Sequence, residues 1–269
     1  MITRFAPAPT GYLHLGHVLN AVYVWELARA SGPDSRVLLR IEDHDRTRSR
    51  PEFESALVED LEWLGFSPDG EVVRQSARGA IYEDALNALR TRALVYACGC
   101  SRSEIGPGPY PGTCRGKNLP DTDGAGLRVR LDLEIERFDD LRLGPQEQRP
   151  SEQCGDIMVR DRNGHWTYQF AVVVDDWLQG VTHVVRGEDL LDSTGRQIQL
   201  ARLLGRREPP AFLHHALLMK TPTQKLSKSD GDTGVRDLRA RGWSARQVID
   251  RAMSLVGISR DRIPTIGRE

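Results

Sequence analysis

Residues 4–17, RFAPAPTGYLHLGH, decide the fold of this chain. The apolar residues within 2–6 predict a short strand, and the proline- and glycine-rich segment 7–11 predicts a turn. Apolar residues then recur at helical spacing from Val18 to Arg29, so we expect a helix there. A strand, a tight turn and a helix in this order are typical of the first unit of a parallel α/β sheet.

His14, Gly16 and His17 lie at the expected N-terminus of this helix. Unpaired backbone N–H groups and the positive end of the helix dipole favour a polyphosphate at such a position. Two imidazoles can donate hydrogen bonds to phosphate oxygens, and a small glycine lets a flat base approach the backbone. The motif therefore predicts part of an ATP site.

A second motif, residues 225–229 or KLSKS, lies near the other end of the chain. The sequence has only four lysines, and three of them, Lys220, Lys225 and Lys228, fall within nine residues. A lysine is a compact charge on a flexible stem, suited to following a phosphate through a reaction. Taken alone, the run is also typical of a solvated basic loop. Together with the histidines, it predicts that Lys225, Ser227 and Lys228 complete one ATP-activating site.

Length and composition describe an ordinary globular chain. Its 269 residues suffice for one large α/β domain or two smaller ones, with 39% hydrophobic and 28% charged residues. No apolar run is long enough to span a bilayer, and the N-terminus lacks a secretory signal, so we expect a cytoplasmic enzyme with reduced thiols. A net charge of −1 argues against a bulk nucleic-acid binder. The low net charge does not exclude selective RNA binding, because the segment 236–246 is locally basic, although taken alone this segment is more typical of a solvated helix face.

The pattern along the chain predicts a doubly wound parallel sheet of the Rossmann-like class. Further expected elements are strands at 36–41, 170–174 and 182–185, and helices at 51–64, 80–94, 193–204 and 245–256. Clusters of Gly, Pro and Asp interrupt the pattern after Cys98. The expected organisation is a discontinuous catalytic domain at 1–97 and 151–220, an inserted α+β subdomain at 98–150, and the lysine loop with a helical segment at 221–269.

The quoted residues resemble the catalytic half of class I glutamyl-tRNA synthetases. Residues 4–17 are similar to the opening signature of that family, 40–45 (RIEDHD) to its next block, and 185–190 (VRGEDL) to a third. The resemblance extends from about Arg4 to Ser229, with the blocks in the order of the family. It implies a class I synthetase catalytic domain that uses ATP with Mg²⁺.

Recognition of glutamate requires cations for two carboxylates and an anion for the ammonium, because unpaired buried charges are costly. Arg4, Arg186 and Glu42 supply that set. The resemblance points to the arginines as carboxylate partners, to Glu42 as the amine partner, and to Tyr168 as a hydroxyl that reaches the substrate from the sheet at 170–174. Ala8 stands in the glutamate pocket where the family usually has a serine, so one polar contact is absent or replaced. Singly, each charged residue could equally form a structural ion pair, and Tyr168 a core aromatic.

The chain ends at Glu269, soon after Ser229. Family members that charge tRNA with glutamate carry a large helical anticodon-binding region after the lysine loop, which we do not expect here. The chain therefore resembles short paralogues that attach glutamate to the queuosine base in the anticodon of tRNA(Asp). This resemblance implies a ligase whose partners are ATP, L-glutamate and a queuosine-containing anticodon loop, and we expect a monomer.

Cys98, Cys100 and Cys114 place three thiols in a Gly- and Pro-rich loop. Their spacing predicts a zinc site, with free thiols as the alternative. Spacing alone does not supply a fourth ligand. The resemblance implies that Tyr110 is that ligand and that the zinc is structural. Cys154 stands apart and is most simply a small buried apolar residue.

Three other functions remain open at this point. A truncated glutamyl-tRNA synthetase would charge the 3′ end of a tRNA. A small nucleotidyltransferase with a His-x-Gly-His motif would not need the set of Arg4, Glu42 and Arg186. A non-catalytic RNA-binding relic would be expected to have lost His14, His17 or Lys228, and all three are present.

Overall fold

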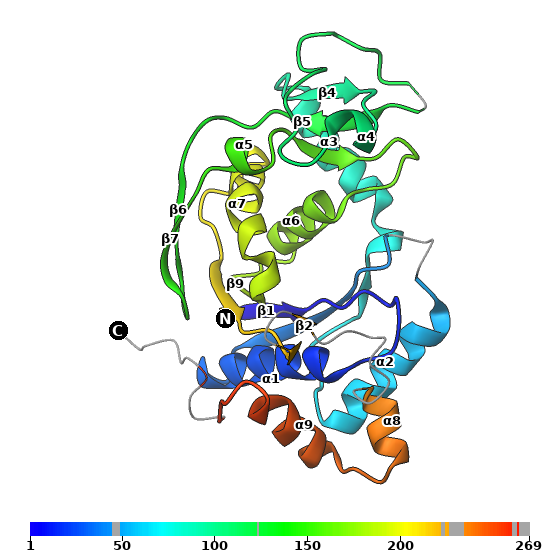
Figure 1. Ribbon diagram of the computed structural model, residues 1–269, viewed down its shortest axis with the longest axis vertical. Coiled ribbons are helices and arrows are strands. Elements are labelled where there is room, and N and C mark those ends of the chain that lie inside the picture. Colours follow the sequence, from blue (N-terminus) through cyan, green and yellow to red (C-terminus); the bar gives the residue numbers. More distant parts are fainter. Residues whose placement is uncertain (45–48, 123, 222–223, 226–233, 260–262, 264–269) are drawn as a thin grey trace. The chain divides into compact units, whose positions relative to one another are not determined.

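The computed structural model describes residues 1–44, 49–122, 124–221, 224–225, 234–259 and 263. Ser227 and Lys228, which the sequence predicts to be part of the ATP site, therefore lie outside the described residues. Two compact units are present (Figure 1): unit 1 comprises Met1–Arg74, Val181–Asp189 and Ala211–Glu269, and unit 2 comprises Gln75–Gly180 and Leu190–Pro210. No described helix has both the length and the apolar character needed to cross a membrane.

Unit 1 contains parallel strands, among them those predicted at 2–6, 36–41 and 182–185. β1 pairs in parallel with β2, and β2 with β3, while β9 pairs in parallel with β10. β9 also lies beside β1, because the Thr182 backbone N–H donates to the Ile2 carbonyl at 2.8 Å. The bounds are β1 Ile2–Phe5, β2 Arg36–Ile41, β3 Val73–Arg74, β9 His183–Gly187 and β10 Ala211–His215. A short antiparallel pair, β11 Met219–Thr221 and β12 Gln224–Lys225, follows.

Helix α1 forms the centre of the core of unit 1. It begins at Leu15, ends at Ala30, and buries residues on all of its faces, with Leu19, Val24 and Leu27 fully inaccessible. A helix that is apolar all round is expected to be buried. In agreement, α1 contacts β1, β2 and β9 as well as α9, Ala245–Ser254 (Figure 1). The remaining helices of unit 1 are α2, Pro51–Leu64, and α8, Val235–Ala240.

Unit 2 has antiparallel strands, so the chain as a whole has mixed α/β sheets. β4 and β8 flank β5 in a three-stranded antiparallel sheet, and β6 and β7 form a hairpin. The strands are β4 Val95–Cys98, β5 Gly126–Val129, β6 Glu136–Asp140, β7 Gly144–Gln148 and β8 Ile157–Arg160. The helices are α3 Gly79–Arg90, α4 Arg102–Ile105, α5 Pro150–Gln153, α6 Tyr168–Leu178 and α7 Thr194–Leu203, with a 3₁₀ turn at Gln75–Ala77. A second 3₁₀ segment, Glu188–Ser193, begins in unit 1 and ends in unit 2.

The strand predicted at 170–174 is wrong, because this segment belongs to α6. A short apolar run rich in valine is typical of a buried strand, yet periodicity alone does not separate such a strand from a buried helix. Asp175, the residue that follows the expected strand, is itself fully buried. Its carboxylate accepts hydrogen bonds from Gln75 at 2.8 Å, Arg78 at 2.6 Å and Tyr82 at 2.9 Å. The polar residue therefore continues a buried helix instead of ending a strand.

Candidate active site

The side chains of His14 and His17 cap the N-terminus of α1 by accepting hydrogen bonds from backbone N–H groups of its first turn. His14 Nδ1 accepts a hydrogen bond from the Gly16 backbone N–H at 3.0 Å, and His17 Nδ1 accepts one from the His14 backbone N–H at 3.2 Å. The ring centroids lie 4.0 Å apart. This is the reciprocal pattern of a capping box, built here from two imidazoles. Because each Nδ1 accepts, a neutral ring carries its proton on Nε2.

The space beside the Gly16 α-carbon holds the His14 ring. A Cβ added to Gly16 would lie 2.8 Å from His14 Cε1 and 3.0 Å from its Nδ1. The sequence predicted that a glycine lets a nucleotide base approach here. That role stays a prediction, and the structure adds a second reason for the glycine, because a Cβ at this position would displace the capping imidazole.

The segment that follows the lysine motif contacts the histidine motif. β12 ends at Lys225, and the described chain resumes at Gly234. Gly234 forms an antiparallel bridge with His14, and the Val235 backbone N–H donates to the Leu13 carbonyl at 2.9 Å. Two stretches from opposite ends of the sequence thus meet at the N-terminus of α1. The roles of Lys225, Ser227 and Lys228 themselves stay predictions.

Arg4, Glu42 and Arg186 lie at the carboxyl ends of β1, β2 and β9, where α/β sheets place their ligands. All three are buried, with 4%, 8% and 4% of their surfaces exposed, respectively. Arg4 donates from a terminal nitrogen to the Val185 carbonyl at 3.3 Å, next to Arg186. The Glu42 backbone N–H donates to the Pro7 carbonyl at 3.0 Å, which brings the loop that contains Ala8 beside it. Unit 1 thus gathers the predicted charges in a buried setting.

Two residues that the sequence reasoning missed support this set. Arg40, fully buried, places a terminal nitrogen 3.5 Å from Glu42 Oε1, so that carboxylate has a cation partner within the protein. His214, also fully buried, accepts a hydrogen bond at Nε2 from Arg186 Nε at 3.0 Å. The sequence did carry a signal for both residues, because each is a polar residue near the carboxyl end of an apolar strand. Arg40 lies in the strand Arg36–Ile41, and His214 lies in the strand Ala211–His215.

Tyr168 is the first residue of α6 in unit 2 and is half-buried. The expectation that it extends from a sheet strand is wrong, because 170–174 is helical. Its role as a hydroxyl partner of glutamate stays a prediction.

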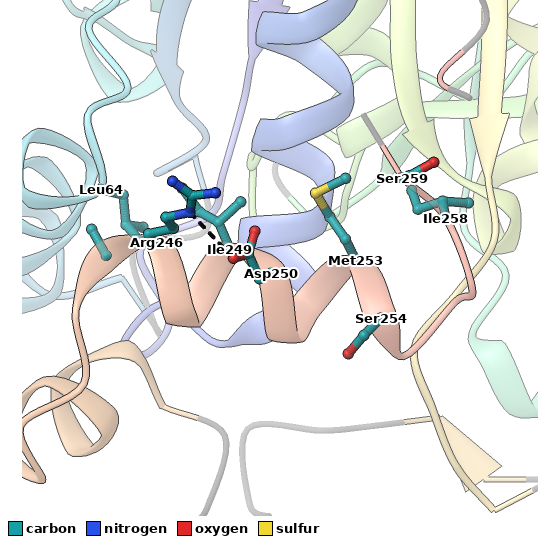
Figure 2. Close-up of a pocket in the computed structure, with 9 residues that line it drawn as sticks. Leu64, Arg246, Ile249, Asp250, Met253, Ser254, Ile258 and Ser259 are labelled. Atoms are coloured by element: carbon teal, nitrogen blue, oxygen red, sulfur yellow. Dashed lines mark ion pairs between the residues drawn. The ribbon is translucent and has the colours of Figure 1, made fainter. Parts of the chain in front are cut away.

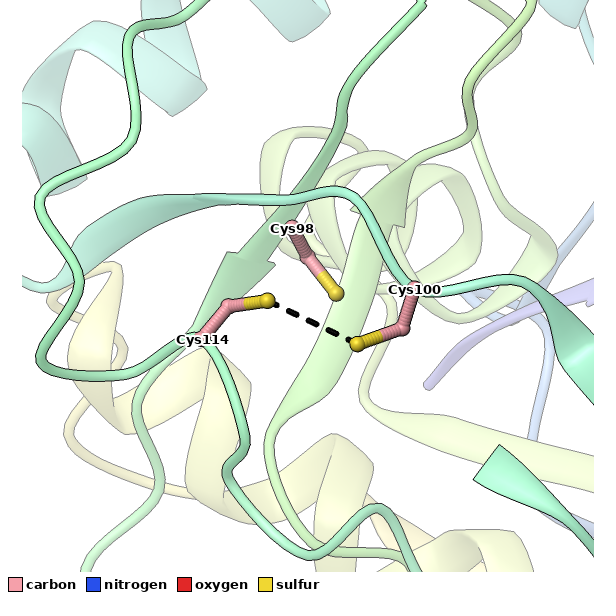
Figure 3. Close-up of side chains that lie close together, drawn as sticks. All are labelled: Cys98, Cys100 and Cys114. Atoms are coloured by element: carbon pink, nitrogen blue, oxygen red, sulfur yellow. Dashed lines mark hydrogen bonds between the residues drawn. The ribbon is translucent and has the colours of Figure 1, made fainter. Parts of the chain in front are cut away.

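The thiols of Cys98, Cys100 and Cys114 converge in unit 2 (Figure 3). Their sulfur atoms all lie within 4.8 Å of one another, and Cys100 Sγ and Cys114 Sγ are 3.5 Å apart. Tyr110 joins them, since its hydroxyl lies 3.4 Å from Cys98 Sγ and accepts a hydrogen bond from the Cys114 backbone N–H at 2.8 Å. The four predicted ligands are therefore neighbours. Cys154 stays outside this group, half-buried, with its thiol near the carbonyl of Pro150.

The backbone at Gly155 fixes the position of Tyr110. The Tyr110 backbone N–H donates to the Cys154 carbonyl at 3.0 Å, and Gly155 has φ +66°. A Cβ at Gly155 would lie 2.1 Å from the Tyr110 carbonyl oxygen. Only glycine allows both this φ angle and this close approach. The chain thus holds the tyrosine against the thiols by backbone contacts.

The thiols differ in how readily they lose a proton. Burial, followed by hydrogen bonding with Cys114, raises the pKa of Cys100 to about 11. For Cys114 burial also acts to raise the pKa, but hydrogen bonds from the Gly99 backbone, Tyr110 and Cys100 outweigh it and lower the value to about 7. A bound divalent cation deprotonates coordinating thiols. Three convergent thiols and a phenol fit a tetrahedral thiophilic ion.

Residues 1–107 and 117–266 match the family model of class I tRNA synthetases (E and Q), catalytic domain. The chain belongs to this class I tRNA synthetase family. It is similar to the glutamyl-Q tRNA(Asp) synthetase of Rhodobacter capsulatus, 42% identical over 92% of this chain and 98% of that protein. The corresponding protein of Bordetella bronchiseptica is 46% identical over 86% of this chain and 75% of its own length.

Among solved structures, this synthetase is similar to a glutamate tRNA ligase from Elizabethkingia meningosepticum in complex with its amino acid. The TM-score is 0.75 at 29% identity, over 86% of this chain and 52% of the other. The chain thus spans about half the length of that ligase.

A groove on this synthetase lies elsewhere in unit 1 (Figure 2). It has a volume of about 670 Å³ and is lined by Leu64, by α9 and by the segment that follows α9. Arg246 and Asp250 form an ion pair in it at 3.6 Å. It contains none of the predicted catalytic residues, so the site that the sequence predicts is distinct from it.

Proposed function

We propose that this protein activates L-glutamate with ATP and transfers the glutamyl group to queuosine in the anticodon of tRNA(Asp). Relatives named for this activity match most of the chain. The observation that carries the proposal is the buried group of Arg4, Glu42 and Arg186 at the ends of parallel strands in unit 1, which also holds the histidine-capped helix. Two guanidinium groups and one carboxylate are the complement of a dicarboxylic amino acid.

In the first step the α-carboxylate of glutamate attacks the α-phosphorus of ATP, and pyrophosphate leaves as glutamyl-adenylate forms. His14 and His17 donate from Nε2 to phosphate oxygens, and Lys225 and Lys228 supply further positive charge. ATP enters as its magnesium complex, which offsets part of its negative charge. Alignment and preorganised electrostatics carry such a reaction, and no protein nucleophile is needed.

In the second step a hydroxyl of the queuosine cyclopentene ring attacks the activated carbonyl. A new ester bond forms and AMP leaves. Arg4 and Arg186 hold the carboxylates, Glu42 holds the ammonium, and Tyr168 supplies a hydroxyl to the substrate. In this proposal the catalytic domain comprises 1–97 and 151–220, with 98–150 as an insertion and 221–269 as the lysine loop and its helical extension.

Two measurements test this function. Glutamate-dependent exchange of pyrophosphate into ATP without RNA is expected, with aspartate and glutamine as matched controls. Labelled glutamate is then expected to enter tRNA(Asp) that carries queuosine and not the same tRNA with guanosine at that position. After ribonuclease cleavage, the label should remain with the anticodon fragment.

A truncated glutamyl-tRNA synthetase would place the label on the 3′ fragment. That result would show that the acceptor is the 3′ end of the tRNA and not queuosine. A small nucleotidyltransferase would show no exchange that depends on glutamate. Absence of any exchange would contradict catalysis itself.

We also propose that Cys98, Cys100, Cys114 and Tyr110 hold a structural Zn²⁺. The support is the convergence of three sulfur atoms within 4.8 Å, with the tyrosine hydroxyl beside them. A site with four protein ligands has no open position for a reactive water, so zinc would hold this loop together and take no part in the reaction.

Removal of the metal by a chelator is therefore expected to lower the thermal midpoint by on the order of 10 °C. Differential scanning calorimetry with and without added Zn²⁺ measures this change. Cys98→Ser should lose the metal, whereas Cys154→Ser, which alters the cysteine outside the group, should keep it. Equal metal content in both variants would contradict the ligand assignment.

A further inference from the structure

Arg128 lies on β5 against the group of three cysteines and Tyr110, and 6% of its surface is exposed. Its Nε donates a hydrogen bond to Cys98 Sγ at 3.3 Å. The guanidinium carbon lies 3.6 Å from the centroid of the Tyr110 ring. One planar cation therefore contacts two of the four proposed ligands at once.

The pairing of β5 with β4 explains this position. Arg128 lies opposite Tyr96, and Gly126 lies opposite Cys98, the last residue of β4. A third contact of Arg128, from a terminal nitrogen to the Asp156 carbonyl at 2.7 Å, holds the other end of the guanidinium. The side chain is thus fixed from three directions by neighbouring segments of unit 2.

Arg128 differs from the other nearby arginines in its partners. Arg115 contacts the buried carboxylate of Asp156 through Nε at 2.7 Å, so a carboxylate already balances its charge. Arg130 is exposed and donates to the Arg115 carbonyl. Among the described residues, the contacts of Arg128 go to a sulfur, an aromatic ring and a main-chain carbonyl, and no carboxylate is paired with it. Its positive charge is directed at the cysteine and tyrosine group.

A metal site of this composition needs such a charge. Three thiolates around a divalent cation give a net charge of −1, which a phenolate would make −2. Burial of an uncompensated charge is costly, and a permanently charged guanidinium in contact offsets that cost. A hydrogen bond to a thiolate also withdraws charge from the sulfur, which reduces repulsion between the ligands.

We propose that Arg128 is an outer-sphere positioning residue that balances the negative charge of the metal site and holds Cys98 and Tyr110 in place for coordination. This inference rests on the zinc site proposed above. It predicts that the affinity for the metal depends on the charge and the donor geometry of residue 128.

The test compares Arg128→Met, Arg128→Lys and the matched control Arg130→Gln in the full-length chain. Zn²⁺ affinity is measured by competition with a chromogenic chelator. We expect Arg128→Met to bind Zn²⁺ about 10- to 100-fold more weakly, the usual effect of losing an outer-sphere partner. Arg128→Lys keeps the positive charge but lacks the planar arrangement of guanidinium donors, so its affinity for Zn²⁺ should lie between those of Arg128→Met and the wild type. Arg130→Gln, which removes one exposed charge two residues away, should match the wild type.

A spectroscopic measurement separates this role from a purely structural one. With Co²⁺ in place of Zn²⁺, thiolate-to-metal charge transfer reports the electron density on sulfur. Loss of the hydrogen bond to Cys98 Sγ should shift this band to lower energy in Arg128→Met. A residue that only packs would change the thermal midpoint without shifting the band. If Arg128→Met does not fold, the same shift, smaller in size, is expected in Arg128→Lys.

Two results would overturn the proposal, and they differ in meaning. Wild-type affinity and an unshifted band in both Arg128 variants would contradict the role of Arg128 while leaving the zinc site intact. Failure of the wild-type protein to bind Zn²⁺ or Co²⁺ would contradict the zinc site itself.

Discussion

Lys228→Ala is expected to slow glutamate-dependent pyrophosphate exchange by about a thousandfold, the scale on which a single preorganised charge acts at a developing oxyanion. The KM for glutamate should change little, because the lysine acts on the phosphates as charge builds in the transition state. Lys228 lies outside the described residues, and Gly234, further along the chain, forms a bridge with His14. Initial-rate kinetics over a range of glutamate and ATP concentrations measure both quantities.

Lys117→Ala is the matched control for that experiment. Lys117 is an exposed lysine in unit 2, outside both sequence motifs, so its removal changes the net charge equally. The control should exchange pyrophosphate at the wild-type rate. A variant at 228 that kept its turnover but lost its affinity for glutamate would show that the lysine belongs to the amino-acid pocket instead.

Elements with strong local signals could be predicted from sequence. For α2, Pro51 at the start, apolar residues at helical spacing, and Gly65 at the end all indicate the same bounds, and the structure confirms Pro51–Leu64. Gly65 has φ +83°, the left-handed conformation that ends helices and favours glycine. Strand β2 was likewise predicted at its observed bounds, Arg36–Ile41.

Segments whose structure depends on distant partners could not be predicted in the same way. Helix α6 has the valine content of a strand, and only its burial against the rest of unit 2 determines its conformation. The helix predicted to reach residue 94 ends at Arg90, because Ala93 has φ +54° and Val95 begins β4. Local propensity does not reveal that turn.

The residues of the candidate sites likewise divide into those that a local sequence pattern predicts and those whose contacts depend on the pairing of distant strands. Residue types and spacing predicted the cysteine group, because Cys98 and Cys100 are close in sequence and Cys114 follows in the same loop. Arg128 contacts that group only through the register of β4 with β5, which no local pattern indicates. His214 reaches Arg186 for the same reason, across the pairing of β10 with β9.

Arg186→Gln is expected to raise the KM for glutamate by roughly 30- to 4,000-fold, which corresponds to about 2–5 kcal/mol for truncating a buried, hydrogen-bonded charge partner. The KM for ATP should stay within about twofold, since Arg186 lies on β9 and not in the cap of α1. Pyrophosphate-exchange kinetics test this, with Arg29→Gln as the control, because Arg29 is 69% exposed and pairs only with Glu26 among the described residues.

The same assay, repeated with glutamine and with Arg4→Gln, assigns the two arginines. Glutamine differs from glutamate only in its side-chain amide, so the arginine that binds the side-chain carboxylate should govern the preference between them. His214 fixes Arg186 Nε at 3.0 Å, and Arg4 instead donates to the Val185 carbonyl. Because the hydrogen bond from Nε to His214 orients the Arg186 guanidinium for planar recognition of a terminal carboxylate, we expect Arg186→Gln to abolish most of the preference and Arg4→Gln to preserve it. An equal loss of the preference for glutamate in both variants would mean that the two arginines bind the same carboxylate. Wild-type kinetics in both variants would contradict the assignment of this pocket to glutamate.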